Sequence, residues 1–396
     1  HGFRNGMGTQ TNLLEMWEKI VDKLEKEGAL VEFWSFDLTK AFDLLDHNKV
    51  LHLKEAGVTG SVGKMIEHWL CGRTQYVETG GFKSRTVPVN KSCVQGSVLG
   101  PTLWLVYIQS LMNKLKANGV SYYGYADDIA IVKTIKTDSD REEFEVILKI
   151  LEDWAKEYGM LWSPLKTQRL VMKYKGCKEP RTPHEIRFLG EIIIPQESKA
   201  ESLGLLISKN CLFGAHIKRI ADRLRSINFK VRRNFISRDP KIMQKIYNTY
   251  MMPCVDYCSI IYNPGSDAMI RPITKAVEAF WKLCSSDKPH ENFMDPRLRL
   301  ILNDLVFFHG MAHGVSIINF KKLFKEESPI SPEMLKENSY FRDKKLRIPK
   351  WRLQLAKNRF SFRVRKYWNL LPKRIKLLKR FGFKREVKKY IRKFKR

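Results

Sequence analysis

Three aspartates in the first third of the chain have the chemistry and spacing of a metal-dependent phosphoryl-transfer site. Asp37 ends one apolar run, and Asp127 and Asp128 are adjacent in the bend of another. Phosphoryl transfer needs little covalent help from protein, but it needs metal ions that activate the attacking hydroxyl and stabilise the charge on the leaving group. Two Mg²⁺ ions about 3.5–4 Å apart serve both purposes, and they prefer carboxylate oxygens. An aspartate at a strand end and a pair in a neighbouring turn can supply these ligands.

Short strands must position these carboxylates. Residues 30–36 are apolar and rich in aromatic and β-branched side chains, which predicts a buried strand that ends at Asp37. Residues 120–132 predict a strand, a tight turn from Ala126 to Asp128, and a second strand. An Asp–Asp pair in a bend is usually an ordinary turn, because Asp suits that backbone. The functional interpretation therefore depends on the surrounding sequence.

The remaining periodicity predicts an α+β sheet domain followed by helices. Helical spacing of apolar residues predicts helices over residues 10–26 and 144–158. Mixed strand and helix patterns continue to about Ser208, and mainly helical patterns begin at Leu212. The first candidate boundary is therefore near Lys209, and the second is the stretch 326–332, which contains two prolines.

The composition favours a folded protein with a polyanionic partner. Hydrophobic residues make up 43% of the 396 residues, enough for a sizeable core. Lys and Arg number 72 against 42 Asp and Glu, a net charge of +30, which favours nucleic acid over a membrane as the partner. No apolar run approaches the roughly 20 residues of a membrane helix. Seven irregularly spaced cysteines, without a signal peptide, predict reduced thiols and an intracellular protein.

The positive charge is concentrated at the C-terminus. Residues 341–396 contain 24 Lys or Arg and two acidic residues, which gives them +22 of the total charge. Aromatic residues and cations alternate there, as in Arg359-Phe360, Phe362-Arg363 and Lys366-Tyr367-Trp368. Such side chains can stack on unpaired bases and contact phosphates. The alternative is a set of amphipathic helices with solvated basic faces.

Three segments, in chain order, resemble the palm motifs of reverse transcriptases: the run from Phe36 to Asp43, the run from Gln95 to Pro101, and the run from Tyr125 to Asp128. Nearly the whole chain is similar to the reverse transcriptases of non-LTR (LINE-type) retrotransposons, specifically of the CR1/Jockey kind. The other segments that carry this resemblance are His1 to Arg4, Ser163 to Thr167, Ser202 to Leu205, Ser361 to Arg363, and Tyr367 to Pro372.

The resemblance implies a right-hand polymerase. Partial fingers and palm would occupy residues 1–209, a helical thumb 210–325, and a basic, nucleic-acid-binding C-terminal extension 326–396. The implied enzyme is an RNA-directed DNA polymerase, a nucleotidyltransferase that uses two Mg²⁺ ions, for which Mn²⁺ can substitute. Its implied partners are an RNA template, a DNA primer or target and deoxynucleoside triphosphates, with no assured protein partner. Target-primed synthesis on nicked chromosomal DNA implies a nuclear location.

The resemblance also assigns the metal site and a selectivity residue. It implies that Asp37 and Asp127 bind both metal ions, and that Asp128 supports the metal site and the primer end. Phe42, five residues after Asp37, would be the steric gate that excludes a ribose 2′-hydroxyl. The alternative for Phe42 is an ordinary core aromatic.

Further binding residues follow from the same resemblance. Gln95 and Gly96 would lie along the template and incoming nucleotide, where a plain turn is the alternative. Lys166 would contact the triphosphate and protonate the leaving pyrophosphate, unless it only belongs to a solvated face. Arg4 would contact the template, and Leu203-Gly204 would form the primer grip between palm and thumb.

Some features depart from the family pattern. Val94 replaces the usual Pro before the Gln–Gly pair, and Ser163 replaces an Asn. Neither change removes a metal ligand, so we expect an altered rate rather than lost chemistry. The sequence starts at His1, and the resemblance implies that an upstream fingers segment with triphosphate-binding basic residues, and an endonuclease, belong before it. The chain is therefore expected to be a fragment of reduced activity.

Three alternatives remain open. A maturase-type polymerase of group II introns is disfavoured by the Ser361 to Pro372 segment. An inactive nucleic-acid-binding remnant of a decayed retroelement is disfavoured by the presence of all three aspartates. A zinc site is also conceivable, because Cys254 and Cys258 are four residues apart, as are His309 and His313, but this spacing matches no known finger.

Overall fold

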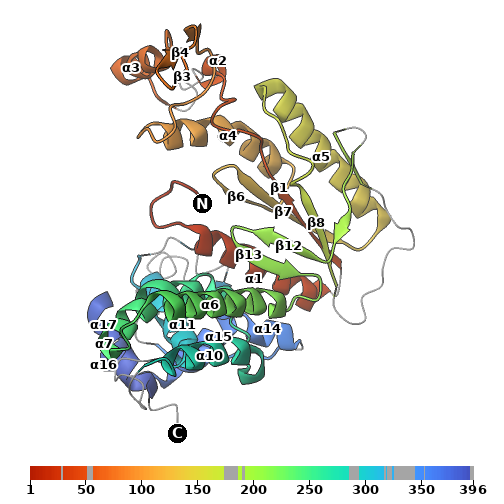
Figure 1. Cartoon of the computed structure of the whole chain (residues 1–396). Coiled ribbons are helices and arrows are strands. Elements are labelled where there is room, and N and C mark those ends of the chain that lie inside the picture. The colour runs from red at the N-terminus through yellow and green to blue at the C-terminus, as the bar shows by residue number, and fades with distance from the viewer. Residues whose placement is uncertain are drawn as a thin grey trace. The chain divides into compact units, whose positions relative to one another are not determined.

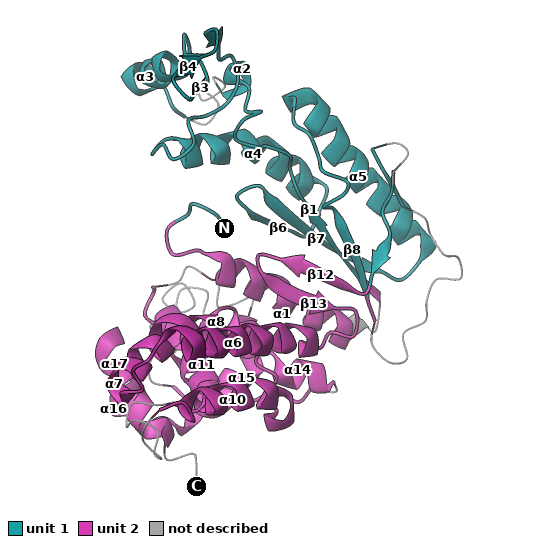
Figure 2. Ribbon diagram, viewed as in Figure 1, with its two compact units in different colours: residues 1–4, 32–171, 178–197 teal, residues 5–31, 172–177, 198–396 magenta. Residues whose placement is uncertain are grey.

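The structure is a computed structural model, and two compact units make up the chain (Figures 1 and 2). The described residues are 1–27, 30–50, 57–173, 186–189, 192–284, 294–315, 318, 323–324, 344–351 and 353–392. The first unit comprises residues 1–4, 32–171 and 178–197, and the second comprises residues 5–31, 172–177 and 198–396.

A five-stranded sheet forms the centre of the first unit, with the strand order β11–β8–β1–β7–β6. Its strands are β1 (Leu30–Phe36), β6 (Tyr122–Tyr125), β7 (Asp128–Ile135), β8 (Gln168–Met172) and β11 (Gln196–Glu197). Strands β6 and β7 form an antiparallel hairpin, whereas β11 runs parallel to β8. The strand predicted over residues 30–36 and the hairpin predicted over 120–132 are confirmed.

Helices α4 (Gly100–Ala117) and α5 (Asp138–Tyr158) pack on one face of this sheet (Figure 1). Successive side chains of a strand point to opposite faces, so Trp34 and Phe36 of β1 share the face that the helices cover. The ring centroids of Trp34 and Phe144 are 4.9 Å apart. The helix predicted over 144–158 is confirmed, but it starts at Asp138.

The early start of α5 has a local cause. Thr137 is its N-cap: the Thr137 hydroxyl accepts from the backbone N–H of Asp140, and the Asp140 carboxylate accepts from that of Thr137. This reciprocal pair is a capping box, which satisfies two backbone donors at the helix end. The periodicity of apolar residues does not indicate the start of the helix at Asp138, because the first turn of the helix is polar.

Smaller elements complete the first unit. They are α2 (His47–Val50), α3 (Gly60–Leu70), β2 (Thr74–Gln75), β3 (Glu78–Thr79), β4 (Phe82–Lys83), β5 (Val87–Pro88), β9 (Arg187–Phe188) and β10 (Ile192–Ile193). Strands β2 and β5, β3 and β4, and β9 and β10 form two-stranded antiparallel pairs.

The described part of the second unit is mainly helical and includes a β-hairpin. The hairpin is β12 (Lys199–Ser202) with β13 (Leu205–Ser208). The helices are α1 (Thr9–Glu27), α6 (Gly214–Asn234), α7 (Pro240–Ile246), the π-helical η2 (Tyr247–Met251), α8 (Met252–Asp256), α9 (Ser259–Tyr262), α10 (Asp267–Trp281), α11 (Pro296–Ala312), α14 (Gln354–Asn358), α15 (Phe360–Leu370), α16 (Lys373–Lys376) and α17 (Arg380–Ile391). The helix predicted over 10–26 and the helical character after Leu212 are confirmed for the described residues.

The compact units and the predicted functional domains divide the chain differently. The units change at residues 197/198 rather than near Lys209, and α1 belongs to the second unit although it precedes the sheet in sequence. The three functional domains stay a prediction, and the predicted boundary at 326–332 lies outside the described residues. The α+β class is confirmed by the mixed first unit and the helical second unit.

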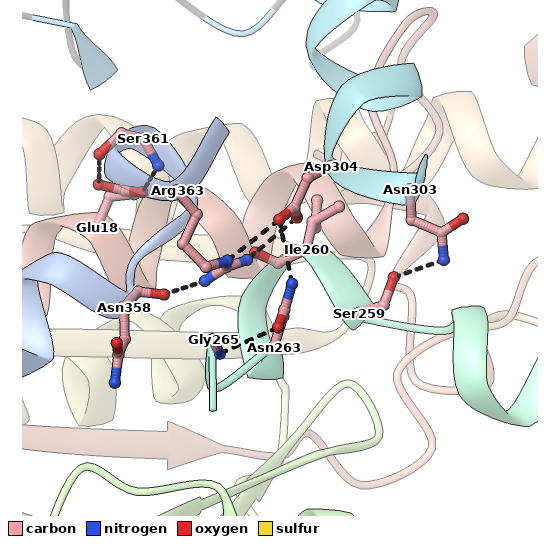
Figure 3. Close-up of polar contacts among 10 residues, drawn as sticks. All are labelled: Glu18, Ser259, Ile260, Asn263, Gly265, Asn303, Asp304, Asn358, Ser361 and Arg363. Atoms are coloured by element: carbon pink, nitrogen blue, oxygen red, sulfur yellow. Dashed lines mark hydrogen bonds and ion pairs between the residues drawn. The ribbon is translucent and has the colours of Figure 1, made fainter. Parts of the chain in front are cut away.

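A buried polar cluster binds the basic C-terminal segment, residues 341–396, to the rest of the second unit through Ser361 and Arg363 (Figure 3). Glu18 of α1 accepts hydrogen bonds from the backbone N–H and the hydroxyl of Ser361, at 2.8 and 2.7 Å. The guanidinium of Arg363 donates to both carboxylate oxygens of Asp304 in α11, each at 3.1 Å, and to the carbonyl oxygen of Ile260 at 2.9 Å. The Glu18–Ser361 hydrogen bonds join residues more than 300 positions apart in sequence.

The interleaved cations and aromatics of this segment are therefore largely internal. Four of its cations are at most 4% exposed: Arg359, Arg363, Arg365 and Lys376. Phe360 and Trp368 are also buried. The interpretation of Arg359-Phe360 and Phe362-Arg363 as nucleic-acid contacts is wrong, because these side chains pack inside the unit and their cations are satisfied by buried carboxylates and carbonyls. The apolar spacing of a helix does not reveal a buried ion pair.

Within the described residues, no helix is both long and apolar enough to span a membrane.

Candidate active site

The turn that carries the aspartate pair is tight and strained. Tyr125 of β6 pairs with Asp128 of β7, which leaves Ala126 and Asp127 as a two-residue hairpin turn. Ala126 has a φ of 54°, in the left-handed region that glycine adopts most easily. A side chain in this region costs energy, so contacts from the surrounding structure must hold the turn.

Two residues hold this turn from the outside. The indole N–H of Trp104, on α4, donates to the carbonyl oxygen of Ala126 at 2.9 Å. Gly2 approaches so closely that a Cβ there would lie 2.5 Å from the backbone nitrogen of Ala126. Such a contact excludes any side chain at position 2. The sequence did not identify Trp104 as a site residue, and it marked Gly2 only through the resemblance of the first four residues.

Asp37 lies immediately after β1, beside the segment that carries Lys166. The backbone N–H of Ser163 donates to the carbonyl oxygen of Asp37 at 2.9 Å, and that of Thr39 donates to Leu161 at 2.8 Å. Residues 163–167 then turn back, and Lys166 Nζ lies 3.1 Å from Asp37 Oδ2. The Lys166 side chain is 68% exposed, whereas that of Asp37 is 26% exposed. The segment at Asp37 and the segment at residues 163–167, which were predicted from separate motifs, therefore lie in contact.

The three carboxylates influence one another electrostatically. Burial raises the pKa of Asp128 to about 6, and the negative charges of Asp127 and Asp37 act in the same direction, against Lys166. Burial also raises the pKa of Asp127, with Asp37 adding to the shift, while its own backbone N–H and Lys166 oppose it. Carboxylates that are buried together without a matching positive charge favour a proton or a cation.

The described residues contain no cluster of three or more His, Cys, Asp or Glu side chains arranged to hold a metal ion. The three aspartates are therefore coupled through their charges but are not gathered into a finished metal cage. Nor does this part of the structure support the zinc alternative. Cys258 is fully buried, and the His309 Nε2 atom lies 2.9 Å from the carbonyl oxygen of Leu378.

Phe42 and Gln95 lie on two loops that are bound to each other. The backbone N–H of Cys93 donates to the carbonyl oxygen of Phe42 at 3.0 Å, and Gln95 Nε2 donates to Asp43 Oδ1 at 2.9 Å. Phe42 is half-buried, and its ring centroid lies 5.5 Å from that of Trp104. Gly96 has a φ of 80° with open space where a Cβ would be, so its backbone conformation rather than crowding requires glycine.

Arg4 is exposed in the first unit, and its predicted template contact stays a prediction. Leu203 and Gly204 belong to the second unit, where they form the two-residue turn between β12 and β13. Both have positive φ, 45° and 78°, as such hairpin turns require. Their primer-grip role also stays a prediction.

Two side chains that the sequence did not identify hold this second turn. The Tyr257 hydroxyl donates to the carbonyl oxygen of Leu203 at 2.5 Å, and Arg219 donates to that of Gly204. A Cβ at position 204 would lie 3.2 Å from the Tyr257 ring. The turn is therefore fixed by contacts from α6 and from the residue that follows α8.

Comparison with known proteins shows which family the first half of the chain matches. A family model described as reverse transcriptase (RNA-dependent DNA polymerase) matches residues 1–193. The RNA-directed DNA polymerase from mobile element jockey of Drosophila melanogaster is 24% identical over 287 residues, covering 69% of this chain and 30% of that protein. The jockey polymerase of Drosophila funebris is 23% identical over 272 residues, covering 66% of this chain and 29% of that protein.

A solved structure of apo telomerase from Candida tropicalis gives a TM-score of 0.41 at 12% identity, covering 98% of this chain and 57% of that chain. This likeness is too low to define the fold. The chain spans less than a third of the length of the two jockey polymerases.

Residues 1–193 are therefore a reverse transcriptase domain. Both relatives are named as polymerases of a mobile element, and their similarity to about two thirds of this chain agrees with the resemblance to non-LTR retrotransposons that its motifs carry.

Proposed function

We propose that this chain is the catalytic part of an RNA-directed DNA polymerase that adds deoxynucleotides to a DNA 3′-hydroxyl on an RNA template. The observation that carries the proposal is the coupling of Asp37, Asp127 and Asp128 beside Lys166. Burial and mutual repulsion raise the pKa of Asp127 and Asp128, so the site favours a cation.

The donor set is suited to Mg²⁺, because it consists of hard carboxylate oxygens. Asp37 and Asp127 would hold two ions, with Mn²⁺ as a substitute, and Asp128 would support them and the primer end. When bound, the ions activate the 3′-hydroxyl and stabilise the charge on the departing pyrophosphate. Lys166 pairs with Asp37 at 3.1 Å, and its exposure leaves it free to turn toward a triphosphate and protonate the leaving group.

The loops beside the carboxylates supply nucleotide selection. Phe42 would exclude a 2′-hydroxyl, and its fixed backbone and contact with Trp104 support that role. Gln95 and Gly96 would lie along the template and incoming nucleotide, and Arg4 would contact the template. The hairpin turn Leu203-Gly204 would hold the primer, because a turn fixed by Tyr257 and Arg219 can present backbone groups to a strand.

The second unit also presents cations that can reach phosphates. On α6, Lys218, Arg225 and Arg232 are exposed on one face with Phe229, whose ring is 63% exposed. Exposed cations on α17 include Lys384, Arg385 and Lys389. RNA template and DNA primer or target are the proposed partners, with target-primed synthesis in the nucleus as the setting.

Primer extension tests the polymerase proposal. The parent chain is given an oligo(A) RNA template with a DNA primer, Mg²⁺ and deoxynucleotides, beside the Asp127→Ala/Asp128→Ala double variant. Extension by the parent and none by the variant would support the chemistry and its location. If neither extends and both bind RNA equally, the result favours a nucleic-acid-binding remnant, and extension by a chain with an upstream fingers segment added becomes the next test.

The affinity for RNA is expected to fall steeply with salt. Six to ten phosphate contacts would lower affinity by roughly 10³–10⁵ between 50 and 200 mM salt, because bound cations release counterions from the backbone. Replacing exposed Lys218, Arg225 and Arg232 by Gln should flatten this dependence. Fluorescence anisotropy with labelled RNA measures it, and an affinity that changes less than tenfold over this range would contradict the proposed surface.

A further inference from the structure

Trp104 contacts two separate parts of the proposed active site. Its side chain is fully buried on α4. The indole N–H donates to the carbonyl oxygen of Ala126, between the two strands that present Asp127 and Asp128. The ring lies against Phe42, the proposed steric gate, with 5.5 Å between centroids and 36° between the ring planes. A metal-site turn and a selectivity residue thus share one support.

The hydrogen bond acts on the peptide group that leads into Asp127. The Ala126 carbonyl belongs to the same peptide plane as the backbone N–H of Asp127, and that N–H interacts with the Asp127 carboxylate. Rotation of this peptide would break both interactions at once. Because Ala126 is held at a φ of 54°, the turn does not favour this orientation by itself. The indole N–H of Trp104 is a donor from outside the turn that holds this orientation.

We propose that Trp104 is a positioning residue that couples metal binding to deoxynucleotide selection, because its N–H orients the peptide before Asp127 and its ring supports Phe42. This inference rests on the proposed function. An ordinary core tryptophan would contribute to stability alone, so the two parts of the side chain must be tested separately and against another buried tryptophan.

The experiment replaces Trp104 by β-(3-benzothienyl)alanine, which keeps the shape of the ring but has sulfur in place of the N–H. The matched control is the same replacement at Trp154, which is also fully buried and donates to Ser110 Oγ at 2.9 Å, away from the aspartates. A second variant, Trp104→Leu, removes the ring as well. The measurements are Mn²⁺ binding by electron paramagnetic resonance, without nucleotides, and the ratio of deoxynucleotide to ribonucleotide incorporation.

Loss of the N–H at position 104 is expected to weaken Mn²⁺ binding roughly two- to tenfold, the effect of one hydrogen bond, and to leave the incorporation ratio within twofold. Trp104→Leu should weaken Mn²⁺ binding and also lower the incorporation ratio at least fivefold. The Trp154 replacement should change neither quantity. This pattern separates positioning from stability, because both isosteric variants lose one partly buried hydrogen bond of equal length.

Unchanged Mn²⁺ binding in the Trp104 isostere, or an equal loss in the Trp154 isostere, would overturn the positioning role. An unchanged incorporation ratio in Trp104→Leu would overturn the coupling to Phe42. If the parent binds Mn²⁺ but extends no primer, the polymerase function fails while the metal measurements still decide whether Trp104 positions the turn. If the parent binds no Mn²⁺, both proposals fall.

Discussion

Removal of the Arg363 guanidinium should sharply destabilise the second unit. Asp304 and Arg363 form a two-pronged ion pair, and their side chains are 0% and 5% exposed (Figure 3). Asn263 Nδ2 also donates to Asp304, at 3.1 Å. In Arg363→Ala the carboxylate keeps this amide but loses the cation that is bound to it. Removing one partner of a buried pair costs about 3–5 kcal/mol, because an uncompensated charge stays behind.

The loss should depend on pH. Burial raises the pKa of Asp304 above its ordinary value, and Arg363 opposes that shift. Without Arg363 the folded-state pKa rises further, while the unfolded-state pKa stays near 3.8. A carboxyl whose pKa is higher in the folded state destabilises the fold only when it is ionised in the unfolded state. The loss in Arg363→Ala should therefore be full at pH 7 and shrink as the pH falls toward 4.

Urea unfolding at pH 7 and pH 4, with hydrogen exchange of the α11 and α15 amides, measures the loss. Arg225→Ala is the matched control, because Arg225 pairs with Asp222 on the surface, with side chains 55% and 52% exposed. Its cost should stay below about 1 kcal/mol at both pH values. The double variant Arg363→Met/Asp304→Leu should recover more than half of the single loss. A loss below about 1 kcal/mol in Arg363→Ala at pH 7, or one that does not change with pH, would refute the reasoning.

Three further variants probe the site and the second turn. Asp128→Asn should stabilise the metal-free chain by about 1–2 kcal/mol above pH 6, after allowance for solvent screening. The reason is that the raised pKa of Asp128, about 6, makes its ionised form unfavourable in the folded chain. Urea unfolding in the presence of a chelator measures the gain, which should vanish near pH 4. Gly2→Ala should slow primer extension at least tenfold, because its Cβ would meet Ala126 at 2.5 Å, whereas Gly8→Ala, with open space at its Cβ, should keep the parent rate. Tyr257→Phe should lower stability by about 1 kcal/mol and raise the KM for primer more than it changes kcat, because it frees the Leu203 carbonyl; equal changes in both constants would contradict this.

The sequence predicted the elements whose signals are local. The strand ending at Asp37 and the hairpin bend at Asp127 were both predictable, because apolar runs and turn residues are read within a few positions. Trp104 was not, since its bond to Ala126 joins residues 22 positions apart and an apolar helix position says nothing about an indole N–H. The contacts of Arg219 and Tyr257 with the Leu203-Gly204 turn were not predictable for the same reason. Long-range contacts of this kind have no periodic signature.

Composition also could not distinguish buried, ion-paired cations from exposed cations at the C-terminus. Arg363 and Lys389 are both cations in a strongly basic segment, but Arg363 is buried against Asp304 whereas Lys389 is exposed on α17. The helical spacing shows only that Arg363 lies among apolar neighbours. An arginine at the edge of the apolar face, with its charged end in solvent, would give the same pattern as a buried one. The positive charge available to phosphates is therefore smaller than the net charge of the segment suggests.

Asp304 and the aspartates of the turn differ in how their charge is balanced, and this difference supports the proposed location of the metal site. Asp304 has a buried arginine and an amide bound to it, so its charge is neutralised from within. Asp128 is half-buried, and the positive group that lowers its pKa is Lys166, which is largely exposed and pairs with Asp37. Burial of carboxylates without an internal cation is unfavourable, and folds retain it where a bound cation or proton completes the site. The turn at Asp127 and Asp128 is thus where an external cation would stabilise the first unit, as the proposed polymerase chemistry requires.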